Sequence, residues 1–464
     1  MNINTPTGTH ALSRPPALTR ARIGWVLFAP GIETVNVLLL YFIMAPYVTN
    51  IVIGDGVLGQ TLWGWISAIG AIIIAIGGQI LGTVTDIIGA QKRFIAFFIS
   101  AGAIGAASLW LATPAAEPWL ILLVSLATLT LMVGTELSIV LYNAMLPRLA
   151  PAHLVGRLSG TAIATGISWG LLVLGAYISL FMIPDTPFLG LDKSTHEHDR
   201  ISGPISALAM LIFALPLLIL APRTPLNRVC LPIKRLTLGV FAETIASMKA
   251  HPRIARFIIA RMIYQDGIGV ALTFGSIYAA GHFGWGGLEL GIFGMVVLGS
   301  SAAGAFIGGR VDDRFGARNT ILGALLLLVF ALLLLISIPT PAETTSGFLA
   351  TPLEQLFIAT ACILGVAIGP AQGSGRSLMA RLAPAGQSGR WFGIMALTGN
   401  AVAFTGPMLV AILTHVYDSQ RAGLMVAPCL ILLGFAIMLF VHRDNPAGAE
   451  TLSNSSAAPE PSRQ

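Results

Sequence analysis

The sequence predicts an all-α membrane protein in which twelve transmembrane helices form two pseudo-symmetric six-helix bundles. Three observations predict this architecture: an apolar composition, twelve long apolar runs, and a repeat that relates the two halves. Of the 464 residues, 55% are hydrophobic and only 10% are charged, whereas about a quarter of an ordinary soluble domain is charged. Because so little charge is left to cover a water-exposed surface, much of the surface must contact lipid.

Each of the twelve runs is long enough to cross a bilayer, which takes about 20 apolar residues in a helix. Gly and Pro interrupt several runs, which is tolerated because neighbouring helices satisfy the freed backbone groups. The runs lie near 24–49, 60–84, 94–112, 118–145, 158–183, 202–221, 256–280, 287–309, 317–338, 353–379, 390–416 and 421–441.

The runs divide the chain into two bundles with polar segments around them. The linker contains a short amphipathic stretch, Leu238 to Met248, which is either a helix on the inner leaflet or part of a plain connection. We expect a cytoplasmic tail at 1–23, bundles at 24–221 and 256–441, a cytoplasmic linker at 222–255 and a disordered cytoplasmic tail at 442–464.

The basic residues indicate how the helices are oriented. In membrane proteins the cytoplasmic loops carry the excess of Lys and Arg. Twenty-three of the 26 basic residues fall on the side of the tails and the even-numbered connections, and the three exceptions are Lys193, Arg200 and Arg421. This asymmetry predicts cytoplasmic termini in a multi-pass protein of the bacterial inner membrane. It also explains the net charge of +6 as topology, so we expect no nucleic-acid partner.

Two segments recur at equivalent loops of the two halves. The segment RLAPA at 148–152 recurs at 381–385, and a Gly-Arg pair follows each copy. The halves are therefore expected to be structural duplicates related by an axis along the membrane normal, which places a cavity at their interface. The other recurrence is that of Gly82, Asp86 and Gly89 as Gly309, Asp313 and Gly316.

The segments GTVTDIIGAQKR at 82–93 and GGRVDDRFGAR at 308–318 are candidate gating loops. They resemble the signature loop of the major facilitator superfamily, and the resemblance implies a cytoplasmic gate whose charged contacts hold the outward-open state. A tight, positive-inside turn without a gating role is the alternative. The gating candidates are Gly82, Asp86, Gly89, Lys92, Arg93, Gly309, Asp313, Arg314, Gly316 and Arg318.

The second repeated segment contributes four arginines on the same side. Guanidinium groups suit carboxylates and the carbonyls at helix C-termini. We expect a structural clamp between neighbouring helices rather than contact with a solute. These structural arginines are Arg148, Arg157, Arg381 and Arg390.

Three acids lie inside apolar runs: Glu33, Glu136 and Asp266. A charged side chain at the bilayer midplane costs ~2.5–3.5 kcal/mol on insertion scales, so each acid needs a partner, a proton or an aqueous cavity. Because a low dielectric disfavours the anion, each is a candidate proton carrier. Ordinary hydrogen bonding near a membrane face is the alternative for Glu136 and Asp266. Further candidates for a polar lining are Asn36, Tyr41, Asn143, Tyr264, Gln265, Gln372 and Arg376.

Six segments spread over both halves resemble the family of the vacuolar amino-acid effluxers of fungi and their bacterial relatives. The resemblance implies the major facilitator fold, in which helices one, four, seven and ten line a central cavity, and all three acids fall in that set. The stretch Tyr264-Gln265-Asp266-Gly267 retains the family's pattern, which strengthens Asp266 as a site candidate. The matching segments are 59–93, 142–160, 260–269, 274–285, 292–318 and 369–384.

The first helix departs from that family's pattern. Members carry an Asp followed by a Trp-Ala-Asn-Ser-like stretch, whereas this chain has Ala29 at the Asp position. Glu33 lies one turn along the same face, and we expect it to replace that Asp, so the family's substrate is not transferred directly. The Gly-Pro pair of drug antiporters is absent between Gly156 and Met182, which disfavours a multidrug exporter.

The sequence thus predicts a secondary active transporter that moves a small polar solute, such as an amino acid, by proton-coupled alternating access. The alternative is a protein of the same fold that no longer transports and instead binds a partner in a membrane assembly. We do not expect an enzyme, because the acidic pair Asp312-Asp313 belongs to a repeated loop and no GxxxxGK[ST] phosphate-binding segment occurs.

We expect no cofactor and no bound metal. Cys230, Cys362 and Cys429 are far apart and lack the spacing of a metal or redox site. His196 and His198, in the outer loop 184–201, could bind a metal, but a solvated loop is the favoured interpretation. The expected partners are the lipid bilayer, a small solute and a coupling proton, and we expect a monomer.

Overall fold

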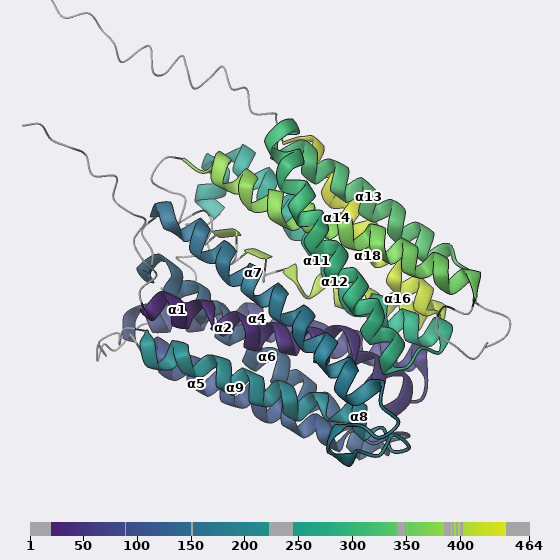
Figure 1. The fold of residues 1–464 in the computed structure, drawn as a ribbon. Coiled ribbons are helices and arrows are strands. Elements are labelled where there is room, and N and C mark those ends of the chain that lie inside the picture. Colours follow the sequence, from purple (N-terminus) through teal and green to yellow (C-terminus); the bar gives the residue numbers. More distant parts are fainter. Residues whose placement is uncertain are drawn as a thin grey trace, which may run out of the picture.

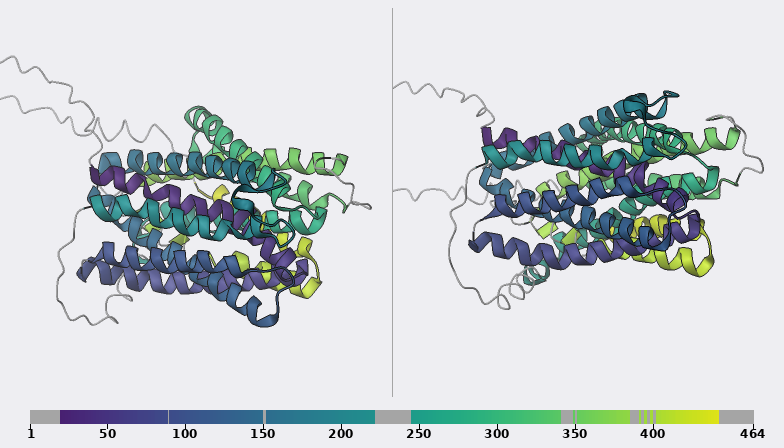
Figure 2. Two further views of the ribbon diagram at one scale, coloured as in Figure 1. Left: turned by 60° about the horizontal axis from the view of Figure 1, so that its bottom comes forward. Right: turned by 90° about the horizontal axis from the view of Figure 1, so that it is seen from below.

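The computed structural model describes residues 20–88, 90–149, 152–221, 245–340, 349, 351–384, 391, 394–395, 398–399 and 402–441. Nearly all of these residues are helical. Figure 1 shows the purple-to-teal helices of the N-terminal half grouped beside the green-to-yellow helices of the C-terminal half. Figure 2 shows that the axes of the long helices are roughly parallel to one another.

The N-terminal half contains the first six long helical rods. They comprise α1 (Arg20–Val26), α2 (Phe28–Val35), η1 (Asn36–Phe42), α3 (Met44–Tyr47), η2 (Val48–Val52), α4 (Gly56–Ile88), α5 (Gln91–Ser108), η3 (Leu109–Leu111), α6 (Pro118–Leu149), α7 (Ala152–Tyr177), η4 (Ile178–Met182), η5 (Phe188–Gly190), α8 (Glu197–Arg200) and α9 (Ser202–Leu220).

The C-terminal half follows after the helical stretch 245–250, of which residues 245–248 belong to the predicted amphipathic segment. The rest of that segment lies outside the described residues. The half comprises α11 (Pro252–Phe283), α12 (Gly287–Phe315), α13 (Ala317–Ser337), α14 (Pro352–Leu382), α16 (Thr405–Tyr417), α17 (Gln420–Leu424) and α18 (Val426–Leu439).

Eleven helices of the described chain are long and apolar enough to cross a membrane, which confirms the all-α membrane fold. The predicted run 390–416 is described only in part, with α16 as its longest piece. Several helices extend beyond the apolar runs: α4 continues to Ile88 and α14 to Leu382. The predicted ends at 84 and 379 are too short because backbone hydrogen bonding continues into the polar residues where hydropathy falls.

The first span is not a uniform α-helix. It passes through the π-helical segments η1 and η2, with a break at Ile43, where φ is −114° and ψ is −69°. Single π-turns are rare and often lie at functional sites. In η1, the main-chain carbonyl of Tyr41 accepts a hydrogen bond from Ser276 Oγ of α11. The wider turns therefore lie where the two halves meet.

The two ends of the bundle differ in how the halves contact each other. We call the end that holds Arg20 and Leu439 the terminus end, and the end that holds Val52 and Gly56 the distal end. Among the described residues, the hydrogen bonds between the halves lie toward the distal end. The structure is thus closed on the distal side.

Two glutamines form most of these distal hydrogen bonds. Gln60 Nε2 of α4 donates to Thr414 Oγ1 of α16 at 2.8 Å and to the main-chain carbonyl of Gln420 at 3.1 Å. Gln420 Nε2 donates in return to the main-chain carbonyl of Gly56 at 2.7 Å. We call this set, Gly56, Gln60, Thr414 and Gln420, the distal latch.

Glycines on α12 allow the halves to approach closely at a second contact, formed by α12 with η1 and η4. A Cβ on Gly294 would lie 2.6 Å from the Phe42 ring, and one on Gly291 would lie 2.8 Å from the Ile178 side chain. Small residues of this kind let membrane helices approach until their backbones nearly touch. The distal closure therefore combines polar bonds with tight apolar packing.

The same helix provides a test of packing inside the C-terminal half. A Cβ on Gly304 would collide with the main-chain carbonyl oxygen of Val366 in α14, whereas Gly299, also on α12, faces open space. We expect Gly304→Ala to destabilise the protein by about 1–3 kcal/mol through overpacking, and Gly299→Ala to be neutral. Thermal unfolding of both purified variants in detergent measures this. Equal melting temperatures for both variants and the wild type would contradict the packing described for α12 and α14.

Candidate functional site

A cavity of about 390 Å³ lies between the two halves. Its walls come from η1, α4 and α6 on one side and from α11, α16 and residues 399–403 on the other. Sites for small solutes generally fall in the range of ~300–1,000 Å³. The polar side chains in the wall are Ser67, Glu136, Gln265, Asp266 and Thr273, and the large apolar ones include Trp63, Met132, Met262 and Phe274.

Two of the three predicted acids face this cavity, one from each half. Glu136 on α6 has no hydrogen-bond or ion-pair partner within the described part of the chain. Asp266 on α11 accepts a hydrogen bond from the main-chain N–H of Gly406 at 2.8 Å. The carboxyl groups therefore share one chamber, and neither is neutralised by a described basic side chain.

Glu33 lies elsewhere, between the first and fifth spans. It is not among the described residues that line the cavity. The Glu33 side chain packs against Gly170 of α7, and a Cβ at Gly170 would be only 2.9 Å from Glu33 Cγ. Asn36 Nδ2 donates a hydrogen bond to Glu33 Oε2 at 3.5 Å. The lack of a side chain at Gly170 makes the room for Glu33.

The other predicted lining residues separate into three kinds. Gln265 lines the cavity, and its buried Oε1 has no described hydrogen-bond partner. Tyr264 is fully buried and packs against Gly434 of α18 instead. Asn143 is exposed on α6, and Gln372 is partly buried on α14. Neither of these two is among the described residues of the cavity wall.

Arg376 has a basic neighbour that sequence reasoning missed. Arg376, on α14, is partly buried, and Arg261 of α11 packs against the residue before it, Gly375. Arg261 Nη1 would be 2.5 Å from a Cβ on Gly375 and lies 3.5 Å from the Tyr264 hydroxyl. No acidic side chain within the described residues pairs with either arginine. The signal in the sequence was a second arginine inside the seventh span, five residues before Asp266.

The first gating loop is described only in part. Gly82 and Asp86 belong to α4, but their side-chain surroundings lie outside the described residues, as does Gly89 altogether. Lys92 Nζ donates to the main-chain carbonyl of Ala221 at the end of α9, and Arg93 is exposed. The loop thus contacts the neighbouring helix of its own half.

The second gating loop places a different acid inside than the repeat suggested. Asp313 and Arg314 are exposed, whereas Asp312 is buried and its Oδ1 lies 2.9 Å from Arg381 Nη2 of α14. Asp312 continues the buried face of α12 that includes Gly304 and Gly308, and this helical spacing was the signal available in the sequence. The inward acid is therefore Asp312.

The other predicted gating residues and structural arginines are as follows. Gly316 has a positive φ of 83° and forms the turn between α12 and α13, and Gly309 faces open space. Arg318 Nη2 donates to the main-chain carbonyl of Leu439 at 2.7 Å. The side chains of Arg148 and Arg157, and all of Arg390, lie outside the described residues. The clamp role of these arginines stays a prediction.

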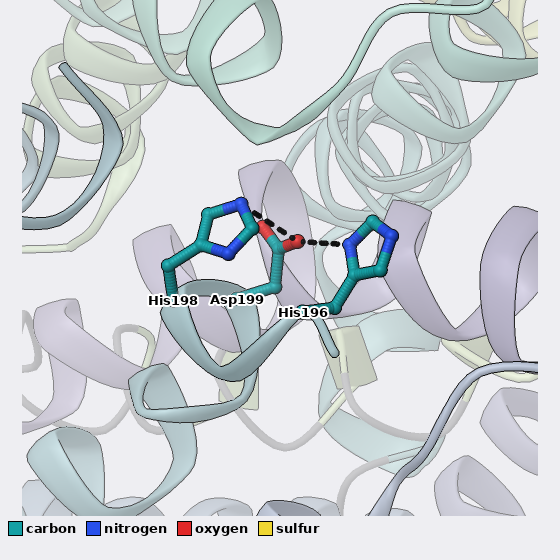
Figure 3. A group of neighbouring side chains, drawn as sticks. All are labelled: His196, His198 and Asp199. Carbon is teal, nitrogen blue, oxygen red and sulfur yellow. Dashed lines mark hydrogen bonds and ion pairs between the residues drawn. The ribbon is translucent and has the colours of Figure 1, made fainter. Parts of the chain in front are cut away.

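The outer loop 184–201 is largely accessible to solvent, but one of its carboxylates, that of Asp199, is buried. His196 and His198 flank Asp199, which is buried, and His198 and Asp199 belong to the short helix α8 (Figure 3). His196 Nδ1 lies 2.8 Å from Asp199 Oδ2. The hydrogen bond to this carboxylate raises the pKa of His196 above its ordinary value.

Comparison with known proteins gives a family. The model of the family described as "Vacuole effluxer Atg22 like" matches residues 62–449. The uncharacterized MFS-type transporter YxiO of Bacillus subtilis is 23% identical over 397 residues, which cover 84% of this chain and 87% of that protein. Autophagy-related protein 22-1 of Neosartorya fischeri is 26% identical over 211 residues, which cover 44% of this chain but only 35% of that protein.

Solved structures of major facilitator transporters share the fold. A D-xylose-proton symporter superposes with a TM-score of 0.61 at 17% identity, covering 91% of this chain and 97% of the symporter. The inward-open xylose transporter XylE from E. coli has a TM-score of 0.58 at 18% identity, covering 93% and 98%. These relatives and neighbours are transporters rather than enzymes. The chain therefore belongs to the Atg22-like vacuole effluxer family and is a multi-pass transporter of the major facilitator type.

Proposed function

We propose that the protein is a proton-coupled carrier that moves a small polar solute bearing a carboxylate, such as an amino acid, by alternating access. The observation that carries this proposal is the cavity of about 390 Å³ between the halves, with Glu136 on one wall and Asp266 on the other. A chamber of this kind accepts a solute and protons together.

Glu136 and Asp266 support the coupling of solute transport to proton transport, because the charge of each carboxyl group depends on whether a proton or a cationic solute group is bound in the cavity. An ionised carboxylate in a low-dielectric site is unfavourable without a counter-charge. A bound cationic group or a bound proton would relieve the same penalty, so solute and proton can exchange at Glu136 and Asp266. The hydrogen bond from Gly406 partly stabilises Asp266, whereas Glu136 has no such described partner.

The two arginines support a negatively charged group on the solute. Arg261 and Arg376 lie near each other on α11 and α14, toward the terminus end, without a described acidic partner. Guanidinium groups bind carboxylates with paired, charge-assisted hydrogen bonds. A zwitterionic amino acid has a carboxylate that suits these arginines and an ammonium group that suits the acids, and the arginines lie outside the described cavity wall, so it would meet the two sets at different points of its path.

The distal latch supports alternating access. With both termini on the cytoplasmic side of a bacterial inner membrane, as the basic residues predict, closure at the distal end corresponds to an inward-facing carrier. Transport then requires the latch to open while the terminus end closes. The flexible side chains of Met132 and Met262 in the cavity wall can adapt to a solute during that change.

The role of Glu136 and Asp266 in proton coupling is tested by measuring proton flux. In vesicles with a trapped pH-sensitive dye, we expect an amino-acid mixture to drive proton flux in the wild type, and Asp266→Asn and Glu136→Gln each to abolish it because neither amide can carry the proton. Glu117→Gln, a matched change at an exposed acid, should behave as wild type. Unchanged solute-driven proton flux in Asp266→Asn, Glu136→Gln and Glu33→Gln would exclude this coupling scheme.

The arginine pair is tested by affinity. Purified protein is first screened by thermal shift against amino acids, sugars and organic acids as separate classes. For the class that binds, we expect Arg376→Gln to weaken binding about 10- to 100-fold, since a hydrogen bond to a charged group is worth about 1.5–3 kcal/mol. Arg256→Gln, at an exposed position of α11, is the control. Binding of uncharged sugars alone, unaffected by Arg376→Gln, would refute a carboxylate-bearing solute.

The distal latch is tested by accessibility from the distal side. We expect Gln60→Ala to shift the equilibrium toward distal opening about 5- to 30-fold, because its lost bonds are worth about 1–2 kcal/mol in all. A reporter cysteine at Thr273, in the cavity wall, introduced without the three native cysteines, measures this as a faster reaction with an impermeant maleimide. Gln355→Ala, whose side chain bonds within its own half, should leave the rate unchanged. Equal rates for all three proteins would contradict the role of the latch.

A further inference from the structure

A cluster of potential metal ligands lies at the distal end, away from the cavity. His196 Nδ1 is 2.8 Å and His198 Nε2 is 3.5 Å from the same oxygen, Asp199 Oδ2. Figure 3 shows the two imidazole rings on opposite sides of this carboxylate. One ligand atom from each of the three residues lies within 4.8 Å of the others.

The neighbouring basic residues do not neutralise the Asp199 carboxylate. Arg200 Nε donates to the main-chain carbonyl of Trp110 at 2.7 Å, and its guanidinium lies 4.8 Å from the centre of the Trp110 ring. Lys193 Nζ donates to the main-chain carbonyl of Met182 at 2.8 Å. Within the described chain, the two imidazole rings are thus the nitrogen partners of a carboxylate that is buried.

Other contacts hold the three side chains in position. The Tyr177 hydroxyl donates to the main-chain carbonyl of His198 at 2.5 Å, and Ser202 Oγ donates to that of Asp199 at 2.6 Å. The His196 ring lies 5.4 Å from the ring of Tyr47. The His196 side chain is 32% exposed to solvent. An ion can therefore reach the cluster from the distal side.

We propose that His196, His198 and Asp199 form a binding site for a divalent transition-metal ion, for which Zn²⁺ is the natural probe. Two imidazole nitrogens and one carboxylate oxygen, with water in the fourth position, are a ligand set that zinc accepts. Ligand atoms of a tetrahedral zinc ion are about 3.3 Å apart, and the separations of 2.8 and 3.5 Å bracket this value. The two imidazole nitrogens lie within 4.8 Å of each other, so the rings must rotate toward each other to place all three atoms around one ion.

The site lies at the junction of the two halves. A Cβ on Gly287, in the first turn of α12, would lie only 2.5 Å from Asp199 Oδ1 and 2.9 Å from the Met182 methyl group. An ion that fixes Asp199 between two histidines therefore stiffens a contact that belongs to the distal closure. We expect bound Zn²⁺ to favour the closed distal end, a consequence that rests on the proposed alternating access, whereas binding itself does not.

The binding test uses the full chain in detergent with its purification tag removed. Competition with a chromogenic chelator should show one Zn²⁺ per chain, and His196→Ala, His198→Ala and Asp199→Asn should each weaken binding more than about tenfold. His415→Ala, at an exposed histidine near the distal end, is the control and should bind as wild type. No stoichiometric binding by the wild type, or equal binding by all variants, would overturn the site.

Two further measurements separate ligand loss from misfolding. Each variant should match the wild type in gel filtration and in metal-free melting temperature, and only the wild type and His415→Ala should gain melting temperature with Zn²⁺, as ligand binding to the folded state requires. Bound Co²⁺ should give the visible absorption of a site with nitrogen and oxygen ligands, and His198→Ala should lose it. Unaltered Co²⁺ absorption in His198→Ala would also overturn the assignment.

The consequence for transport has its own test. Zn²⁺ on the distal side of vesicles should slow the solute-driven proton flux of the wild type but not of His198→Ala. If Zn²⁺ binds at one ion per chain but does not slow the proton flux of the wild type, the proposed effect on distal closure is refuted, while the proposed metal site still stands. Absence of solute-driven flux in zinc-free wild type would count against the proposed function and leave the site to the binding test.

Discussion

The structure depends on one constraint: an ionisable group within the bilayer must have a partner, a proton or access to water. Glu136 and Asp266 meet it together, because each half contributes one acid to the cavity between them. Neither half alone would provide such a chamber, since the wall of one is completed by helices of the other. Pairing the two halves therefore satisfies a need that no single helix can satisfy.

The contacts between the halves are unevenly distributed, and this asymmetry gives the described state its direction. At the distal end, the hydrogen bonds of the distal latch act together with the close packing at Gly291 and Gly294 of α12. Such polar bonds are individually modest, at about 0.5–1.5 kcal/mol each, so the closure can be reversed by a solute that favours the other state. A carrier needs this balance, because a closure held too firmly would trap one conformation.

The family relationship establishes the fold and the transporter class, whereas the proposal for the solute rests on the geometry of the site. The match to the Atg22-like family extends over residues 62–449, and the bacterial relative YxiO aligns over 84% of the chain. The fungal protein of Neosartorya fischeri shares only 35% of its length with this chain. Neighbours of the same fold include carriers described for xylose and for nucleosides. The solute is therefore argued from Glu136, Asp266, Arg261 and Arg376 rather than from any one relative.

The sequence by itself determined the membrane-spanning helices and their grouping into two halves, because hydropathy and repeated segments are local properties of the chain. It also singled out Asp266 and Glu136, since a charge inside an apolar run is visible without a structure. Only the tertiary structure decided that Glu33 lies against Gly170 outside the cavity wall and that Asp312 rather than its neighbour faces Arg381. It also brought His196 and His198 against a buried Asp199. The physical reason is that these outcomes depend on which face of a helix meets which neighbour, and helix–helix contact is set by packing between segments far apart in the chain.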